Sequence, residues 1–461
     1  MQLLDPHHRF KSLSGTHGTL HHSGRVNFSW FEIIQKIENE NFPENIRGNF
    51  AFIYIPFEHK KNFIAVVDHL TSVPLFISSH FCSSHFATLA EKEKTIKDFE
   101  YDKEFYWESQ LFWGYTASDR TTLTSIKRIP PGHKWQNGKA TKYLDLNQHI
   151  DTQKLSNAEF TETLERVIKR EMGSMNGLLA SGGTDSATLM AIVSKLKLQK
   201  KFRIMSVRSN IEIQNEKLLI DKLAKKINLE INYFDAPTLS VGKNKNSSDI
   251  PSEMFLWKDY SFLYRKMAVA HFDNQDLNCV FTGECGDQLF GGPKLAKQIP
   301  FLLQNKNWSS RDIAKQYINL SMRESALEWQ GYQSSSLIEW YKTVDPDKNT
   351  FNRVYEETIE RIANFFDSMD TTDLLNRLLN INLVFKGPYR LFHYSQDACY
   401  FSHPFADWEI VALSLRSRSQ DKIYNKGRLK EIFYQSYQKH LINEIWEAPK
   451  TGTAIPIQKI T

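Results

Sequence analysis

The sequence is poor in cysteine, in long apolar runs and in unbalanced charge, and each shortage removes a class of protein. Its 461 residues include four cysteines, none in a CxxC pair, so neither a disulfide framework nor a zinc site is expected. No run approaches the roughly 20 apolar residues of a membrane span, and the polar, histidine-rich start is unlike a signal peptide. We therefore expect a cytoplasmic protein without a membrane partner. The net charge of +5 is small and well mixed, so a nucleic-acid partner is not expected either.

Two parts of the chain differ in pattern, which predicts two domains. Up to about residue 150, β-rich runs at 50–55, 63–67 and 75–78 predict antiparallel sheet, and Asn137-Gly138 predicts a two-residue hairpin turn. From Ser156, with Glu159 completing a capping box, short apolar runs alternate with helical patterns. We predict a β-rich domain at 1–150 and an α/β domain at 151–461, with a parallel sheet and a helical C-terminal part. The expected strands are 177–180, 202–207, 231–234 and 278–282, and the expected helices are 156–172, from 186, 215–227, 255–271 and most of 308–438.

The strongest local signal is the segment LLASGGTDSATLM at 178–190. A hydrophobic strand runs into the small residues of SGGTDS, and a helix follows at once. Small residues let the backbone approach a ligand, and free N–H groups at the helix start face it, so the segment predicts a pyrophosphate cradle. It is not a Walker A loop, because GxxxxGKS and GxxxxGKT are absent. Asp185 adds a carboxylate where a Mg²⁺ ion would accompany the phosphates. The alternative is an ordinary glycine-rich turn with Asp185 as a helix cap.

A second motif, FTGECGDQLFGG at 281–292, follows another apolar strand. In a parallel sheet both motifs leave at the same carboxyl edge, where the ligands of such sheets bind. We therefore expect the carboxylates of Asp185, Glu284 and Asp287 to converge there. The alternative is a solvated acidic turn.

The two motifs together resemble the synthetase domain of the asparagine synthetase B family, which carries an SGGxDS loop and a GExxDExFGG element. The segments GNFAFIYI, VVDHLTSVPLF and LFWGYTASDRTTLTSIKRIPPGH are similar to the second half of the family's N-terminal domain. Asn215-Glu216, 403–407 (HPFAD), 426–430 and 448–452 (APKTG) are similar to its C-terminal landmarks, in the same order.

The resemblance implies a PP-loop synthetase domain, of the adenine nucleotide α-hydrolase type, which uses ATP and Mg²⁺ to adenylate a carboxylate for attack by an amine. It implies that Asp185 and Asp287 hold Mg²⁺ and that Glu284 supports the reacting carboxylate or the metal. Lys450 would contact the α-phosphate and the developing oxyanion. The nucleotide would be held by groups at Ala180, Ser181, Gly182, Gly183, Asp185, Ser186, Val207, Thr282 and Gly283.

The chain lacks the residues that family members use to hydrolyse glutamine. Glutamine-hydrolysing members use a cysteine at the mature N-terminus, whose own amine acts as the base. Here the chain begins Met1-Gln2-Leu3, the first cysteine is Cys82, and the RGPD and NGEIYN elements are missing. We expect no glutaminase activity and a degenerate Ntn-type, glutamine-amidotransferase-like first domain that serves for support or docking.

Branches of the family that lack this cysteine include the β-lactam synthetases and the lasso-peptide cyclases, which use an amine of the substrate itself. Cys285-Gly286 and Gln288 in the second motif, and Ser402-His403 where relatives carry arginine, favour a substrate other than aspartate. We expect macrolactam formation on a precursor peptide, with an associated leader peptidase as partner.

Two other functions stay open, and a third is disfavoured. The chain could form asparagine from free ammonia, or it could be a nucleotide-binding scaffold without catalysis. RNA-thiolating relatives of the first loop are disfavoured, because they need reactive cysteines and a basic surface.

Overall fold

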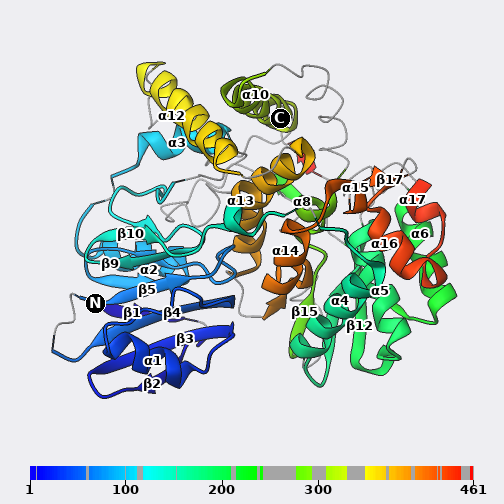
Figure 1. Ribbon diagram of the computed structural model, residues 1–461, viewed down its shortest axis with the longest axis horizontal. Helices are drawn as coiled ribbons and strands as arrows, with labels where there is room; N and C mark the ends of the chain where they lie inside the picture. The colour runs from blue at the N-terminus through cyan, green and yellow to red at the C-terminus, as the bar shows by residue number, and fades with distance from the viewer. Residues whose placement is uncertain are drawn as a thin grey trace.

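The structure is a computed structural model of the chain. It describes residues 1–461 apart from 7, 59–61, 99, 112–117, 152, 209–213, 236–238, 242–276, 293–307, 330–347, 370–372, 396–399, 423, 426–427, 448–456 and 460–461. Figure 1 shows the N-terminal strands gathered on one side of the molecule, the parallel sheet with its helices on the other, and α13 and α14 between them.

The N-terminal part contains two packed sheets. One has the order β10-β9-β5-β4-β3-β2 and the other β1-β7-β6-β8. Apolar side chains such as Ile53, Val67, Leu75 and Ile77 fill a common core, which also holds Cys82. The strands are β1 (Gln2–Leu4), β2 (Lys11–Ser14), β3 (Gly18–Val26), β4 (Gly48–Pro56), β5 (Ile64–Val67), β6 (Phe76–Ile77), β7 (Phe81–Ser83), β8 (Lys127–Arg128), β9 (His133–Gln136) and β10 (Lys139–Lys142), with helices α1 (Trp30–Glu38), α2 (Phe86–Lys94) and α3 (Lys103–Leu111).

Most of the expected β structure is confirmed. The strands β9 and β10 pair antiparallel around Asn137 and Gly138, whose φ angles of 51° and 76° are those of a primed hairpin turn. The runs 50–55 and 63–67 form β4 and β5, which pair antiparallel. The run 75–78 is different, because β6 belongs to the other sheet. The carboxylate of Asp68 accepts hydrogen bonds from the amides of residues 50, 70 and 72, which fixes a turn that leads the chain from one sheet to the other.

The second part contains a five-stranded parallel sheet, as predicted. Its order is β13-β12-β11-β15-β16, and every neighbouring pair is parallel. The strand β16 has only two residues, too few for a sequence pattern. The predicted helix at 255–271 lies outside the described residues. The strands are β11 (Asn176–Leu179), β12 (Phe202–Arg208), β13 (Ile231–Asp235), β15 (Cys279–Phe281) and β16 (Phe401–Ser402), and the helices beside them are α4 (Asn157–Glu171), α5 (Thr184–Lys195) and α6 (Gln214–Ile227).

The predicted start of α4 is confirmed, but the capping box is only half formed. The Ser156 hydroxyl accepts a hydrogen bond from the amide of Glu159 at 3.1 Å. The Glu159 side chain instead pairs with Arg416, so it is not the reciprocal cap. The predicted apolar face of α4 is buried in the core of the sheet.

The rest of the chain is mostly helical, as expected. The helix α13 packs against both α12 and α8, so the helical part is built directly onto the second motif. Within the residues the structure describes, no helix is long and apolar enough to cross a membrane. The helices are α8 (Gly286–Phe290), α10 (Ser310–Trp329), α12 (Lys348–Asp367), α13 (Leu374–Ser395), α14 (Trp408–Leu415), α15 (Ser419–Lys422), α16 (Glu431–Tyr437) and α17 (Glu444–Glu447), and the short strands are β14 (Leu239–Val241), β17 (Tyr424–Asn425), β18 (Arg428–Leu429) and β19 (Ile457–Lys459).

Candidate functional site

The two motifs meet at the carboxyl edge of the parallel sheet. The strands that carry them, β11 and β15, are direct neighbours in the sheet order, with Leu178 opposite Phe281. Their following loops touch: a Cβ atom added to Gly283 would lie 2.7 Å from the Cβ of Asp185 and 3.2 Å from the amide nitrogen of Ser186. The convergence predicted from the sequence is therefore confirmed for these two loops.

The first loop presents backbone N–H groups at the start of α5. Gly182 has a φ of 76°, a left-handed conformation that suits glycine. Gly183, at the N-cap position, provides no side-chain cap. The Ser186 hydroxyl donates to the Gly183 carbonyl and accepts from the Ser181 amide, each at 3.1 Å, which closes the loop. The uncapped first turn can therefore donate hydrogen bonds to an anion.

A buried hydroxyl in the same turn supports this interpretation. The Oγ1 atom of Thr184 is shielded from solvent and has no hydrogen-bond partner among the described residues. A buried polar group without a partner is costly, so such an atom commonly marks the place of a ligand or a water molecule. The loop thus has a geometry into which phosphate oxygens fit.

Two of the three predicted carboxylates converge on one cation. The Nζ atom of Lys430 lies 2.5 Å from Oδ1 of Asp185 and also contacts Oδ1 of Asp287. The lysine side chain is 2% exposed, whereas the side chains of Asp185 and Asp287 are 15% and 40% exposed. The carboxylates are therefore more exposed than the lysine, which lies on their buried side.

Lys430 was missed by reasoning from residue types. It is the N-cap residue of α16 and has a φ of 55°, a left-handed conformation that is uncommon for lysine. In the sequence it is only the last residue of the segment 426–430, which is similar to a C-terminal landmark of the family. Nothing in the pattern of neighbouring residues indicates that its ammonium group reaches the two motifs.

The glycines of the second motif make room for the acids. A Cβ atom on Gly286 would lie 2.6 Å from the carboxyl carbon of Asp185, and one on Gly292 would lie 2.6 Å from the carboxyl carbon of Asp287. Both distances are too short for any side chain. The motif therefore needs glycine at these positions for space around the two carboxylates.

The Asp185 and Asp287 pair fits a magnesium ion. Mg²⁺ is usually bound by one or two carboxylates together with substrate phosphates and water, rather than by a full protein cage. Here a single positive group already lies between the two carboxylates, which shows that the place favours a cation. Among the described residues no group of three or more acidic, histidine or cysteine side chains forms a metal cluster.

The third predicted carboxylate does not complete a three-acid cluster. Glu284 instead acts electrostatically on His403, whose ring contacts the Thr282 hydroxyl at 2.7 Å. Burial lowers the pKa of His403 to about 4, and the negative charge of Glu284 opposes this shift. At neutral pH the ring is therefore uncharged. Glu284 precedes α8, whereas Asp287 lies in the first turn of that helix.

The remaining predicted residues are placed as follows. Val207 lies half-buried at the carboxyl end of β12. The amide of Ala180 donates to the Met205 carbonyl at 2.8 Å, so that amide is not available to a nucleotide. The Thr282 amide donates to the Ser402 carbonyl at 3.0 Å, so the same holds for it. Lys450 lies outside the described residues.

Cys285 is a packing residue. It has a φ of 69° and is 1% exposed, within the core shared by the sheet and the helical part. Cys82 and Cys279 are buried as well. Burial raises the pKa of the Cys82 thiol well above its usual range. None of these three cysteines is placed as a nucleophile.

The N-terminal part contacts the segment that carries His403. The Nε2 atom of His69 lies 3.0 Å from the Ala406 carbonyl oxygen, and the Arg47 guanidinium lies 5.3 Å from the ring centroid of Trp408. Arg170 pairs with Asp407 from the other side. The segment is thus held between the N-terminal sheets and α4, and through His403 it contacts the second motif.

Comparisons with known proteins agree with the motifs. The family model for asparagine synthase matches residues 159–460, about two thirds of the chain. A comparison with curated proteins gave no match.

Several solved structures are similar over part of the chain. One is an NH3-dependent NAD synthetase from Campylobacter jejuni, with 13% identity over 48% of this chain and 94% of that one, and a TM-score of 0.23. Another is an NMN synthetase from Francisella tularensis, with 12% identity over 53% of this chain and 97% of that one, and a TM-score of 0.26. Because the family model covers more than half of the sequence and includes both motifs, the chain belongs to the asparagine synthase family.

Proposed function

We propose that the protein is an ATP-dependent ligase that activates a carboxylate as its adenylate, with release of pyrophosphate, and then passes the acyl group to an amine. Membership of the asparagine synthase family supports the coarser statement, an ATP-using amide-forming ligase. The observation that carries the proposal is the convergence of Asp185 and Asp287, from two separate strand-end loops, on one cation beside an uncapped helix start.

The residues of the site have separable tasks in this reaction. The N–H groups at the start of α5 hold the pyrophosphate portion, because they have no side-chain cap and lie at the positive end of the helix dipole. Asp185 and Asp287 hold Mg²⁺, which when bound offsets negative charge on the phosphates. Lys430 adds a fixed positive charge at the same place. A carboxylate that attacks the α-phosphate brings negative charge onto negative charge, so such fixed cations lower the barrier.

The other two predicted groups act on the acyl side. Lys450 remains our candidate for the group that contacts the α-phosphate and the developing oxyanion, where a compact ammonium suits both roles. Glu284 supports the reacting carboxylate through the neutral pair of Thr282 and His403 beside it. This places the polar substrate contacts on β15, β16 and the following loops.

We propose that the amine comes from the substrate itself and that the product is a macrolactam on a peptide. The buried Cys82 and the filled core between the two N-terminal sheets speak against a thiol nucleophile in that part of the chain. Without ammonia from glutamine, an amine already carried by the substrate is the simplest source. A precursor peptide freed by an associated leader peptidase fits this need.

The test is ATP–pyrophosphate exchange with Mg²⁺ and candidate substrates, namely peptides with a free N-terminal amine and an internal acidic side chain. We expect exchange that depends on the peptide, formation of AMP, and loss of the water expected for a lactam in the peptide mass. Asp185→Asn should lower the rate by about 10²-fold or more. Asp221→Asn, an exposed acid on α6, is the matched control and should leave the rate unchanged.

Other outcomes would decide between the alternatives. Asparagine formed from aspartate and ammonium would replace the macrolactam by an ammonia-dependent asparagine synthetase. Nucleotide binding without turnover for every substrate would leave a non-catalytic scaffold. Release of ADP in place of AMP would contradict adenylation altogether.

A further inference from the structure

A buried lysine lies directly behind the second motif, outside the residues assigned so far. Lys422, the last residue of α15, is 2% exposed. Its Nζ atom contacts the Ser414 carbonyl oxygen and lies 3.3 Å from the Ser414 hydroxyl. A lysine is almost never fully buried unless it has specific partners, so these contacts require a reason.

The partners of Lys422 are the carboxyl ends of two helices. Ser414 lies in the last turn of α14, and its hydroxyl donates to the carbonyl of Leu289, in the last turn of α8, at 3.1 Å. Carbonyl groups at a helix end lack intrahelical partners and carry the negative end of the helix dipole. One buried amino group therefore serves two helix ends, the second through a serine hydroxyl.

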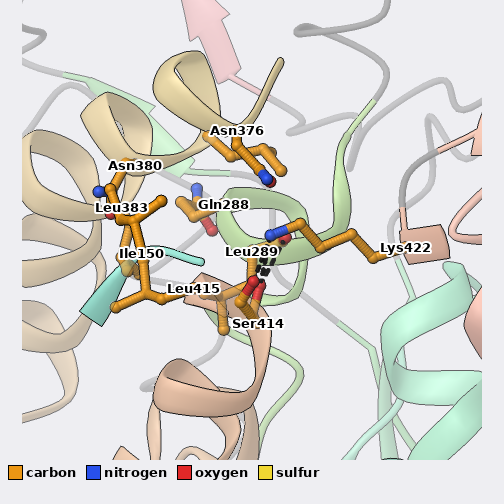
Figure 2. A pocket seen from close by; sticks show the side chains of 10 residues that line it. Ile150, Gln288, Leu289, Asn376, Asn380, Leu383, Ser414, Leu415 and Lys422 are labelled. Carbon is orange, nitrogen blue, oxygen red and sulfur yellow. Dashed lines mark hydrogen bonds between the residues drawn. The ribbon is translucent and has the colours of Figure 1, made fainter. Parts of the chain in front are cut away.

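A small cavity lies beside Lys422, lined by apolar side chains such as Leu383 and Leu415 and by several polar ones. It has a volume of about 10 Å³, room for one water molecule, and Figure 2 shows the side chains of Gln288, Asn376, Asn380 and Lys422 around it. The Oδ1 atoms of Asn376 and Asn380 are buried without a hydrogen-bond partner among the described residues. Both atoms are acceptors, and the residues that carry them line the same cavity as Lys422.

The helix α8 depends on such outside support. It has five residues, far fewer than an isolated helix needs, so its place is set by packing and hydrogen bonds from neighbours. Its apolar side chains, Leu289 and Phe290, point into the core, and its first turn carries Asp287. A shift at its carboxyl end would therefore move Asp287 relative to Asp185.

We propose that Lys422 is a positioning residue of the nucleotide site, whose amino group joins the carboxyl ends of α14 and α8 through Ser414 and thereby fixes the place of Asp287. The proposal rests on the proposed function in one respect, that Asp287 holds the magnesium ion that accompanies ATP. It adds a support that neither motif contains.

The experiment compares two serines at the same helix end. Ser414→Ala removes the hydroxyl that links Lys422 to α8. Ser417→Ala removes a buried hydroxyl that donates to the Leu413 carbonyl and does not reach α8, so it is the matched control. Lys422→Met removes the amino group at similar length. For each variant, Mg·ATP affinity is measured by calorimetry, the melting temperature by scanning calorimetry, and the deuterium exchange of residues 286–290 by mass spectrometry.

We expect Ser414→Ala to weaken Mg·ATP binding about three- to tenfold and to speed exchange in residues 286–290, at a melting temperature close to that of Ser417→Ala. Lys422→Met should weaken binding about tenfold or more, and if it does not fold, the two serine variants still decide. Ser417→Ala should stay within about twofold of the original protein. Equal binding and equal exchange in Ser414→Ala and Ser417→Ala would overturn the proposal.

The exchange measurement separates this proposal from the proposed function. If the unaltered protein binds no Mg·ATP, the proposed function fails. Faster exchange of residues 286–290 in Ser414→Ala alone would then still support the positioning role, and unchanged exchange would remove it.

Discussion

The core between the N-terminal sheets and the edge of the parallel sheet contain different kinds of side chain. Between the N-terminal sheets, apolar side chains fill the core and the Cys82 thiol is enclosed among them. At the edge of the parallel sheet, two carboxylates from separate segments contact one lysine beside the uncapped start of a helix. Burial of apolar side chains stabilises the fold, whereas placing paired charges at a sheet edge costs desolvation free energy. Such charges are commonly retained where they bind a ligand. The comparison favours a catalytic site in the second half, and a supporting role for the first half stays our prediction.

The sharpest way to break this comparison is to remove the cation at the sheet edge. Lys430→Met should lower the rate of ATP–pyrophosphate exchange by about 10²-fold or more, because a fixed positive charge beside the phosphates is lost. It also leaves Asp185 and Asp287 without their shared partner. Added Mg²⁺ should therefore raise the melting temperature of the variant more than that of the original protein. An equal rise in melting temperature with Mg²⁺ in the variant and in the original protein would contradict the idea that Lys430 and Mg²⁺ occupy the same site.

The buried histidine beside the second motif gives a pH-dependent prediction. Burial lowers the pKa of His403 in the folded protein to about 4. Between pH 6.5 and pH 4 the ring therefore binds a proton in the unfolded chain but not in the folded protein. Stability contributed by the neutral ring is present above pH 6.5 and is lost as the pH falls toward 4, by up to roughly 3 kcal/mol.

This loss can be isolated by a double comparison. Urea unfolding of the original protein and of His403→Gln is measured at pH 7.5 and pH 4.5, so that other acid-sensitive groups such as Asp407 cancel. Relative to the original protein, His403→Gln should have a higher free energy of unfolding at pH 4.5 than at pH 7.5. A difference independent of pH would mean that the ring is not held neutral by burial.

A smaller effect is expected at the contact between the two halves. Arg47→Ala removes the cation that lies over the Trp408 ring and should lower the free energy of unfolding by about 1 kcal/mol. The rate of ATP–pyrophosphate exchange at saturating ATP should change less than twofold, since Trp408 is not among the residues assigned to the reaction. A large loss of rate with unchanged stability would show that the N-terminal half takes part in the chemistry.

The smallest effect on activity is expected at Cys82. Cys82→Ala removes a buried sulfur from the core between the N-terminal sheets, so some loss of thermal stability is expected. The rate of amide formation should be unchanged, because the enclosed thiol is held protonated. Loss of glutamine-dependent activity in this variant would contradict the division between the two halves.

The sequence predicted much of the fold because local patterns and long-range structure agree there. The apolar runs 177–180 and 278–282, each followed by glycines and an acid, predicted a parallel sheet with two loops at one edge, and the sheet register confirms it. The hairpin at Asn137-Gly138 was equally predictable, since few residues adopt its backbone conformation. The run 75–78 also forms antiparallel sheet, as predicted, although the sheet that it joins depends on the turn at Asp68. The strand β16 was not predicted, because two residues are too few to leave a pattern.

The site shows the same division. Asp185 and Asp287 could be paired from the topology alone, because neighbouring parallel strands end together. Lys430 could not, because its ammonium group comes from a left-handed residue at the start of a distant helix. Glu284 was expected to join the acids, but it acts electrostatically on His403, a distant residue to which no sequence pattern connects it. Tertiary placement of side chains from separate segments is what single-sequence reasoning lacks.

The central claim is that Asp185 and Asp287 hold the same divalent ion. Its most direct test is Mn²⁺ binding, followed by electron paramagnetic resonance in the presence of ATP, for Asp185→Asn, Asp287→Asn and the double variant. If both carboxylates share one ion, each single variant should lose most of the affinity, and the double variant should lose little more. Losses that simply add, or single variants that bind Mn²⁺ as tightly as the original protein, would contradict the account.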